Sequence, residues 1–182
     1  MVDGEIWGDQ VQVPAVGGDV NQWLQDTLQR DCRLLIIPQQ RARQLDKKFA
    51  PEGALVGFAD RFPFLLTASA SLQDFNTHLE LPITMRRFRP NIEIEGCEPW
   101  AEDSWQRLQI GDVVFRVAAP CARCQIPSID PSTGEMQPAV SRALAKHRRR
   151  DGQIYFGQNL IQEGLVQGGG TIAVGDTVKI LG

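Results

Sequence analysis

The sequence predicts a mainly β protein of the α+β class, a closed and mostly antiparallel β-barrel decorated with about three helices. Short stretches of alternating apolar and polar residues, typical of strands, recur along the chain, and turn-forming Gly, Pro and Asp residues separate them. Only three stretches carry apolar residues at helical spacing. Because these do not alternate regularly with the strands, an antiparallel barrel is favoured over parallel strand–helix units.

Composition limits the class of protein. The chain has 182 residues, of which 42% are hydrophobic and 23% are charged, as in a single soluble globular domain. The formal net charge of −3 is too small to indicate nucleic acid as a partner, and no apolar run approaches the roughly 20 residues of a membrane span. The N-terminus has no signal pattern, and four cysteines do not suggest a disulfide scaffold. We therefore expect a reducing, cytoplasmic setting.

The first part of the chain is predicted to form a strand, a helix and a second strand. Residues 6–16 alternate as a strand does, and residues 19–30 carry apolar side chains at helical spacing. Trp23 in that helix is expected to be a core anchor, because apolar stripes are usually buried. Residues 32–38 predict a buried strand, and the polar residues 39–53 predict a long connection.

The middle of the chain predicts short strands around one helix. Residues 54–59 and 62–67 have the pattern of two strands, and residues 92–95 alternate as a half-buried strand does. Between them, residues 71–80 predict an amphipathic helix with His78 on its solvated side. We expect no ligand role for this histidine.

Two neighbouring acids, Glu102 and Asp103, precede a predicted strand pair over residues 108–117. Paired carboxylates indicate general acid–base chemistry only when both reach the same pocket. The alternative, that they accept hydrogen bonds from free backbone N–H groups in a turn, is favoured here.

The last part of the chain predicts a helix, two strands and a closing hairpin. The helix covers residues 139–150 and ends in a basic run. This run is either a solvated face or a docking surface for an acidic electron-transfer partner. Strands follow over residues 155–157 and 160–166, and residues 171–181 predict the hairpin.

The richest chemistry lies in a Cys-x-x-Cys, Cys121 to Cys124, at the end of an apolar strand-like run. Arg123 directly precedes Cys124, and a guanidinium near a thiol favours the ionised thiolate. A buried structural thiol pair is the alternative. A thioredoxin-type redox motif would need a helix here, which Pro127 argues against. A zinc site would need a second ligand pair that the sequence does not offer.

A second candidate lies in residues 85–95, where three arginines surround Phe88. The planar fork of arginine accepts two oxygens of a phosphate or carboxylate at once. A charged strand edge that prevents aggregation explains the same pattern equally well.

Several stretches together resemble the MOSC domain family, named for the C-terminal domain of molybdenum-cofactor sulfurases, and within it the bacterial YcbX-like proteins and the mitochondrial amidoxime reducing component. The likeness runs from about residue 5 to the end, and it is the order and spacing of the motifs that make it specific. These motifs are Phe88-Arg89-Pro90-Asn91-Ile92, Glu102-Asp103-Ser104-Trp105, Ile110-Gly111, Cys121-Ala122-Arg123-Cys124, Asp130-Pro131-Ser132-Thr133-Gly134, Phe156-Gly157-Gln158 and Gly170-Thr171-Ile172 with Val174-Gly175-Asp176.

The resemblance implies a site for the molybdenum cofactor, Mo-molybdopterin, with Cys124 as the metal ligand and catalytic residue. It also implies that other residues bind the cofactor: the arginine and asparagine of the Arg-Pro-Asn motif contact the pterin and its phosphate, an arginine lies beside the cofactor, and a loop borders the metal pocket. These residues are Arg89, Asn91, Arg123, Gln158 and Asn159.

The chemistry that the resemblance implies is reductive: an electron-donor protein, either a flavoprotein or an iron–sulfur protein, supplies electrons, and the N–O bond of a small N-hydroxylated base or amidoxime is cleaved. The alternatives are a sulfur carrier or cofactor-recognition module with a persulfide on Cys124, and a scaffold with inert thiols. Pyridoxal phosphate is not expected, because no lysine has the context of a Schiff base.

We expect one MOSC domain over residues 1–182, with a leading segment over 1–53 and a barrel core with the cysteine site over 54–182. Relatives of this kind carry a preceding barrel-like domain that helps to bind the cofactor phosphate. The chain is expected to begin at or after that domain, and whether these residues suffice as an enzyme stays open. No four-cysteine ferredoxin pattern is present in the sequence.

Overall fold

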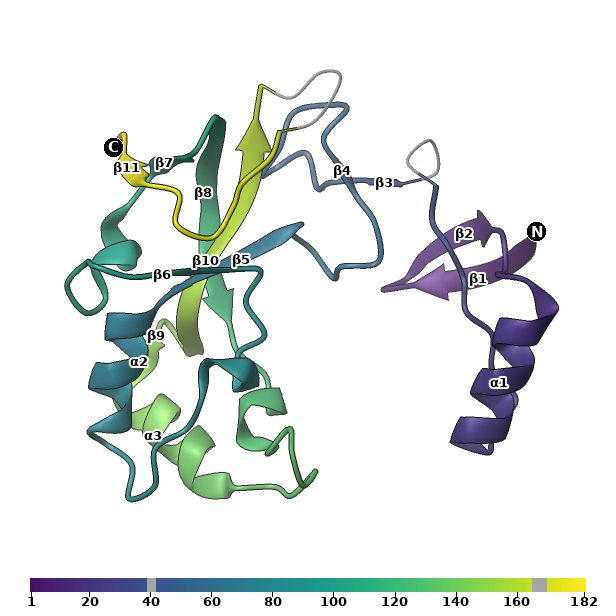
Figure 1. The fold of residues 1–182 in the computed structure, drawn as a ribbon. Helices are drawn as coiled ribbons and strands as arrows, with labels where there is room; N and C mark the ends of the chain where they lie inside the picture. The colour runs from purple at the N-terminus through teal and green to yellow at the C-terminus, as the bar shows by residue number, and fades with distance from the viewer. Residues whose placement is uncertain (39–41, 165–169) are drawn as a thin grey trace. The chain divides into compact units, whose positions relative to one another are not determined.

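The computed structural model describes residues 1–38, 42–164 and 170–182 of the chain (Figure 1). Its contacts divide the chain into two compact units, Met1–Phe62 and Pro63–Gly182. The second unit holds the larger sheet and both thiols of the Cys-x-x-Cys.

The first unit contains two strand pairs and one α-helix. In chain order its elements are β1 (Val2–Ile6), β2 (Asp9–Val13), α1 (Gly18–Leu28), β3 (Arg43–Gln44) and β4 (Leu55–Val56). β1 pairs with β2 and β3 with β4, both antiparallel. The single strand predicted over residues 6–16 is therefore wrong. That stretch contains a hairpin turn, because Trp7 and Gly8 both adopt positive φ (55° and 92°).

Two further predictions for this unit are wrong. Trp23 is 63% exposed, and α1 has no buried residue, so Trp23 is not a core anchor within the described unit. Residues 32–38 do not form a buried strand, because only Leu35 makes a bridge, to Ala15. A strand needs a hydrogen-bonded neighbour along its length, and this segment has one at a single point.

The connection predicted over residues 39–53 contains β3, and the strand predicted over 54–59 is reduced to the two residues of β4. Residues 39–41 lie outside the described part of the chain. The Arg43 side chain fixes this corner, because its Nη1 donates to Asp9 Oδ2 at 2.7 Å and its Nε to the Gly57 carbonyl oxygen at 3.1 Å.

The second unit is built on a seven-stranded sheet. Its strands are β5 (Phe64–Ala68), β6 (Ile92–Ile94), β7 (Arg107–Ile110), β8 (Val113–Ala122), β9 (Arg149–Arg150), β10 (Gln153–Glu163) and β11 (Val178–Ile180). The order is β11-β7-β8-β10-β5-β6, with β9 paired to β10 off this path. All pairs are antiparallel except β5 with β6. The sheet curls into a nearly closed, barrel-like arrangement (Figure 1), which confirms the predicted mainly β fold.

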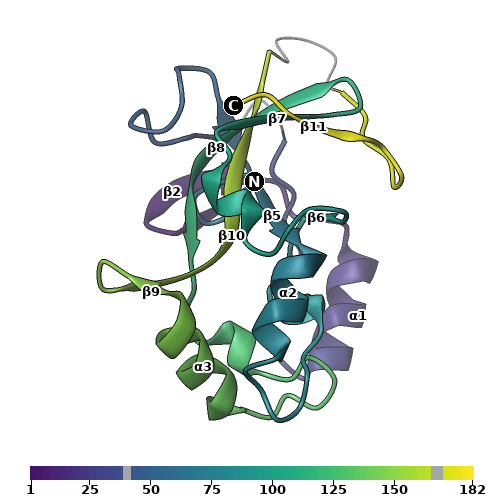
Figure 2. The same ribbon diagram turned by 90° about the vertical axis from the view of Figure 1, so that its left-hand side faces the viewer.

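The described residues contain three α-helices, α1 and, in this unit, α2 (Ser69–Asn76) and α3 (Pro138–Arg148). They confirm the helices predicted over residues 71–80 and 139–150, with ends that differ by a few residues. α2 and α3 lie at one end of the sheet (Figure 2). In the described part of this unit, three 3₁₀ turns connect the strands: η2 (Met85–Arg87), η3 (Ala101–Ser104) and η4 (Ile126–Ser128).

The remaining predictions for this unit are confirmed in part. The strands predicted over 62–67 and 92–95 and the strand pair over 108–117 correspond to β5, β6 and the β7–β8 pair. The two strands predicted over 155–157 and 160–166 are one strand, β10, which ends at Glu163. Residues 165–169 lie outside the described part.

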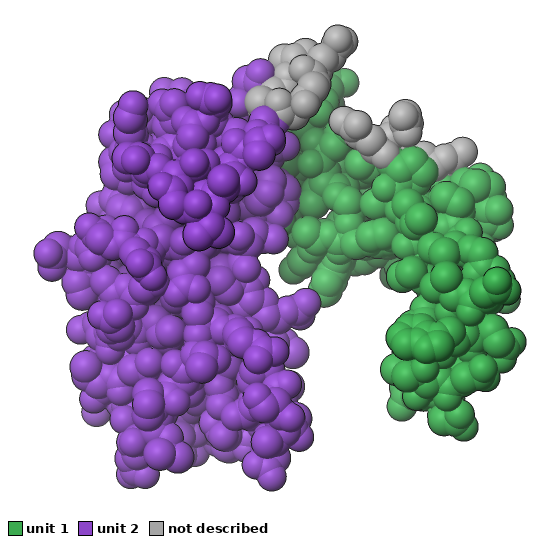
Figure 3. Space-filling model, viewed as in Figure 1, with its two compact units in different colours: residues 1–62 green, residues 63–182 purple. Residues whose placement is uncertain are grey.

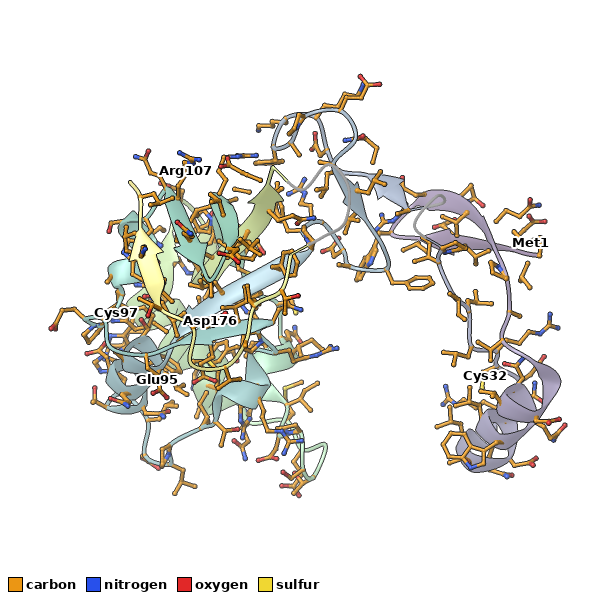
Figure 4. All side chains as sticks on the ribbon, turned by 45° about the horizontal axis from the view of Figure 1, so that its top comes forward. Met1, Cys32, Glu95, Cys97, Arg107 and Asp176 are labelled. Carbon is orange, nitrogen blue, oxygen red and sulfur yellow. The ribbon has the colours of Figure 1, made fainter. Side chains whose placement is uncertain are left out.

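The predicted hairpin over residues 171–181 is wrong. β11 pairs with β7 rather than with a strand of its own segment. The C-terminus continues this pairing, because Leu181 N–H donates to the carbonyl oxygen of Arg107 at 2.9 Å (Figure 4 labels Arg107). β11 therefore pairs with a strand that is distant in sequence, and the local turn does not lead to a hairpin.

Two apolar clusters stabilise the second unit. The first lies on the sheet and takes its buried residues from β5, β6, β7, β8 and β10. The second joins the helices to β10 and includes Phe75 of α2, Leu144 of α3, Phe88 and Phe156. The rings of Phe88 and Phe156 stack with centroids 3.7 Å apart and an interplanar angle of 10°. This stack fixes the backbone that leads into Arg89.

Candidate functional site

The Cys-x-x-Cys lies at the end of a strand, as the sequence predicts. β8 ends at Ala122, and Arg123 N–H extends the pairing by donating to the Ile154 carbonyl oxygen at 2.8 Å. The Cys124 side chain is exposed, whereas that of Cys121 is half-buried. Cys32 belongs to the first unit, and Cys97 lies beside Glu95 after β6 (Figure 4). The exposed thiol of this motif is therefore Cys124.

The Arg123 guanidinium contacts the other thiol of the motif. Its Nη1 donates to Cys121 Sγ at 3.1 Å, and its Nη2 donates to the Phe88 carbonyl oxygen at 2.9 Å. Its Nε is buried and has no hydrogen-bond partner within the described residues. Neighbours in an extended chain point to opposite sides, which explains why sequence adjacency to Cys124 does not give this contact.

A hollow of about 540 Å³ lies beside the Arg-Pro-Asn motif. Its lining residues all belong to the second unit, which Figure 3 draws in purple. Its lining residues are Met85, Arg86, Arg89, Pro90, Glu93 and Pro131. The side chains of Arg86 and Arg89 are exposed, and no described residue pairs with either guanidinium. The only carboxylate in the lining, Glu93, accepts a hydrogen bond from Ser69 at 2.8 Å. Two unpaired guanidinium groups beside a hollow favour an anionic ligand.

The backbone at Arg89 is strained. Its φ is 55°, in the left-handed region that residues other than glycine rarely adopt. Strain of this kind costs energy and persists where the surroundings hold it. Here the Phe88–Phe156 stack and the hydrogen bond from Arg123 to Phe88 hold the preceding residue. The exposed side chain of Arg89 thus follows directly after a residue that is held in place.

Arg87, which the sequence analysis did not single out, connects the two candidate motifs. It is 6% exposed, and its Nη2 donates to Asp130 Oδ2 at 2.9 Å and to Gln137 Oε1 at 2.7 Å. The backbone N–H of Ser132 lowers the pKa of Asp130 most, burial opposes this lowering, and the charge of Arg87 adds a smaller lowering. The Asp-Pro turn after Cys124 is therefore tied to η2, which precedes Arg89.

The asparagine of the Arg-Pro-Asn motif has a structural contact. Asn91 Oδ1 accepts from the backbone N–H of Leu65 at 2.8 Å, and the backbone N–H of Asn91 donates to the Leu65 carbonyl oxygen at 2.9 Å. Both bonds join the start of β6 to β5. The Asn91 side chain is exposed and lies two residues from Arg89.

The predicted loop residues on β10 have different surroundings. Gln158 is 1% exposed, and its Nε2 donates to Asp103 Oδ1 at 2.8 Å. Asn159 is half-buried, and its Nδ2 donates to the Pro120 carbonyl oxygen at 3.4 Å. Asn159 also pairs with Ala119 of β8, near the strand end that carries the thiols. The Gln158 amide is thus committed to an internal hydrogen bond.

Glu102 and Asp103 have separate structural partners, but these are side chains and not the backbone N–H groups that the sequence predicted. Glu102 is fully buried and accepts from Ser71 Oγ at 2.8 Å, and burial raises the pKa of its carboxyl. Asp103 instead accepts from Arg148 Nη2 at 2.6 Å. The two carboxylates therefore do not form an acid–base pair in one pocket.

A second hollow lies in the first unit and is lined by side chains of both charges. It measures about 440 Å³ and is lined by Trp7, Asp9, Arg43, Gln44, Leu45, Asp46, Val56, Asp60 and Arg61. Its most buried charge, Arg43, is neutralised by Asp9 at 2.7 Å. Within the described residues, no group of three or more His, Cys, Asp and Glu side chains is placed to hold a metal ion.

The described residues also contain no helix with the length and apolar character that a bilayer span requires.

Comparison with known proteins identifies the family. The family model of the MOSC domain matches residues 54–179, which is more than half of the chain. The chain belongs to the MOSC domain family. The matched region contains both the Arg-Pro-Asn motif and the Cys-x-x-Cys of this MOSC domain protein.

Curated relatives of this MOSC domain protein include reductase components and a sulfurase. Mitochondrial amidoxime-reducing component 1 of Mus musculus is 36% identical over 192 residues, which cover 100% of this chain and 56% of the relative. The human protein of the same name is 33% identical over 191 residues, covering 97% and 55%. Molybdenum cofactor sulfurase of Oryza sativa subsp. japonica is 28% identical over 181 residues, covering 90% and 22%. The chain thus spans about half the length of the amidoxime-reducing relatives.

Proposed function

We propose that this MOSC domain binds the molybdenum cofactor through Cys124 and takes part in the reduction of N-hydroxylated bases or amidoximes. The observation that carries the proposal is the junction at Phe88, where the Arg123 guanidinium connects the segment of Cys124 to the segment of Arg89. This hydrogen bond joins two segments of the chain. One carries a thiol that suits a soft metal, and the other carries a guanidinium that suits a phosphate.

The residues present fit the cofactor in their chemistry. Molybdopterin offers sulfur ligands and a phosphate, so a protein needs one thiolate for the metal and cations for the phosphate. Cys124 is exposed and available as a thiolate ligand. Arg86 and Arg89 line the hollow of about 540 Å³ without protein partners among the described residues. Arg123 adds a buried Nε with an unsatisfied hydrogen.

When bound, the cofactor would supply a metal that accepts electrons and passes them to the substrate. In the proposed reaction an amidoxime takes up two electrons and two protons, its N–O bond breaks, and an amidine and water leave. The chain's own residues position the cofactor: Arg123 holds the Phe88 backbone, and Arg87 holds the turn after Cys124 through Asp130. An electron-donor protein, a flavoprotein or an iron–sulfur protein, would supply the electrons.

The test is cofactor loading and turnover of the chain itself. The protein is produced in cells that make molybdopterin, and its molybdenum and pterin contents are measured. Reduction of benzamidoxime to benzamidine is then followed with reduced methyl viologen as the electron source. We expect bound molybdenum and turnover in the natural sequence, and loss of turnover in Cys124→Ala. The matched control is Cys121→Ala, in which the neighbouring thiol is removed and the metal ligand stays. Absence of molybdenum and of turnover in the natural sequence would refute the proposal.

A sulfur carrier is the second candidate, favoured by the exposure of Cys124 and by the likeness to the rice molybdenum cofactor sulfurase. In that case Cys124 would carry a persulfide, without turnover of amidoximes. Mass spectrometry of the peptide that contains Cys124 distinguishes the candidates, because a persulfide adds one sulfur atom to its mass.

A further inference from the structure

A group of cations on α3 and β9 has no role in the site described above. The segment from Pro138 to Arg150 contains no acidic residue. Two of its cations, Arg148 and Arg150, pair with Asp103 at 2.6 and 3.4 Å. The other three have exposed side chains and no partner among the described residues. These three, Arg142, Lys146 and Arg149, are called the basic ridge below.

Helix geometry places two of the ridge residues on one face. Arg142 and Lys146 are four residues apart on α3, which is the spacing of neighbours on a helix surface. Arg149 follows directly after the helix, in the extended backbone of β9. The opposite face holds Val140 and Leu144, which are 3% and 2% exposed and pack in the core. The ridge therefore faces away from the core of the unit.

Fold stability does not account for the basic ridge. Like charges at a spacing of four residues repel each other and weaken a helix. Cations in the last turn interact favourably with the helix dipole, which explains Lys146, but Arg142 lies too far from the C-terminus for this effect. Arg148, not a ridge residue, makes the ion pair that ties α3 to η3. The ridge charges are available to a partner.

The sheet connects the basic ridge to the cysteine motif. Arg149 pairs with Ile154 across β9 and β10. On the other side, the Ile154 carbonyl oxygen accepts the backbone N–H of Arg123 at 2.8 Å, and Cys124 is the next residue. Two strand spacings of about 4.8 Å each separate the backbones of Arg149 and Arg123. One end of the ridge is therefore close to the strand end that carries Cys124.

We propose that the basic ridge is the docking surface for a small acidic electron-donor protein that reduces the cofactor held by Cys124. This inference rests on the proposed function, because the donor protein would supply the two electrons that cleave the N–O bond and would itself be oxidised. Complementary charge steers such partners into contact and accelerates their encounter. The net charge of −3 and a ridge of only three free cations favour a protein over nucleic acid.

The test separates docking from chemistry. Benzamidoxime reduction by the full chain is measured with two electron sources: methyl viologen, which needs no docking, and an acidic plant-type ferredoxin kept reduced by NADPH and its reductase. The variants are Lys146→Glu and the double variant Arg142→Glu/Lys146→Glu. The matched control for Lys146→Glu is Lys179→Glu, which makes the same charge change at an exposed lysine of β11 that has no partner among the described residues.

We expect kcat/KM for ferredoxin to fall by about tenfold or more in the double variant, mainly through KM, and by less as salt rises. Rates with methyl viologen and with Lys179→Glu should stay as in the natural sequence. Equal ferredoxin rates in all variants, with methyl viologen turnover intact, would overturn the docking surface alone. Absence of methyl viologen turnover in the natural sequence would instead count against the proposed function.

Titration of oxidised ferredoxin onto each protein tests the ridge without turnover. We expect the dissociation constant to rise about tenfold in the double variant and to stay unchanged in Lys179→Glu. Unchanged ferredoxin binding, together with loss of binding to a fluorescent single-stranded RNA in the double variant, would assign the ridge to nucleic acid and overturn the proposal.

Discussion

The Arg123 guanidinium donates from Nη2 to the carbonyl oxygen of Phe88 at 2.9 Å. Each of these residues directly precedes a residue of the proposed site: Cys124 follows Arg123, and Arg89 follows Phe88. Phe88 is itself fixed by its ring stack on Phe156. A single hydrogen bond thus relates the proposed metal ligand to the proposed phosphate ligand on a rigid base.

Arg87→Met should lower the free energy of unfolding by about 2 kcal/mol or more, because it removes a buried guanidinium and leaves the Asp130 carboxylate without its ion partner. Urea unfolding measures the effect. The matched control is Arg86→Met, an exposed arginine one residue away, for which a change within about 0.5 kcal/mol is expected. Equal effects of the two substitutions would contradict the assigned role of Arg87.

Arg89 should show opposite effects on stability and on cofactor retention. Arg89→Gly relieves the strain of a φ of 55° and should raise the free energy of unfolding by up to about 1 kcal/mol. The same variant should retain less cofactor, because it loses the guanidinium. Arg89→Ala keeps the strain and should lose cofactor without the gain in stability. Full cofactor retention in both variants would mean that Arg89 does not hold the phosphate.

Gly157→Ala should be strongly destabilising. A Cβ at this position would lie 2.6 Å from the Leu66 carbonyl oxygen, on a backbone with a φ of 80°. Gly152 has nearly the same φ, 79°, but no atom within 4 Å of its Cβ position. Thermal or urea unfolding should therefore give a loss of about 1 kcal/mol for Gly152→Ala and more than about 2 kcal/mol for Gly157→Ala. Similar losses would show that crowding against β5 contributes nothing.

Glu102 should make the folded protein less stable as the pH rises. Burial raises the pKa of its carboxyl in the folded state, so the folded protein binds this proton more tightly than the unfolded chain does. The contribution is present below the ordinary glutamate pKa of about 4.3 and is lost as the pH rises through the folded pKa. Glu102→Gln keeps a neutral partner for Ser71 and should remove this loss. Urea unfolding at a series of pH values from about 4 to about 8 compares the two proteins. An identical pH dependence would contradict a raised pKa.

The sequence was sufficient for the mainly β class and for the position of the thiols, because these depend on local patterns. The apolar run up to Val117 and the turn residues after Cys124 place the motif at a strand end without any tertiary information. The core helices α2 and α3 were predictable for the same reason, since their apolar residues recur at helical spacing.

Tertiary contacts account for what the sequence could not predict. Arg87 is one of several arginines in its segment, and nothing in the run distinguishes the buried one from the exposed ones. The contact of Arg123 with Cys121 rather than Cys124 depends on which way each side chain leaves the backbone. Trp23 has the pattern of a core residue, but no described residue of its unit covers it. Burial is decided by neighbours that a local pattern does not contain.

The most direct test of the account counts the sulfur atoms around molybdenum. X-ray absorption spectroscopy at the molybdenum edge is recorded for the loaded natural sequence and for Cys121→Ala and Cys124→Ser. We predict the same sulfur shell in the first two and one fewer sulfur neighbour in Cys124→Ser, because only that thiolate binds the metal. An unchanged sulfur shell in Cys124→Ser would contradict the role of Cys124 and, with it, the proposed site.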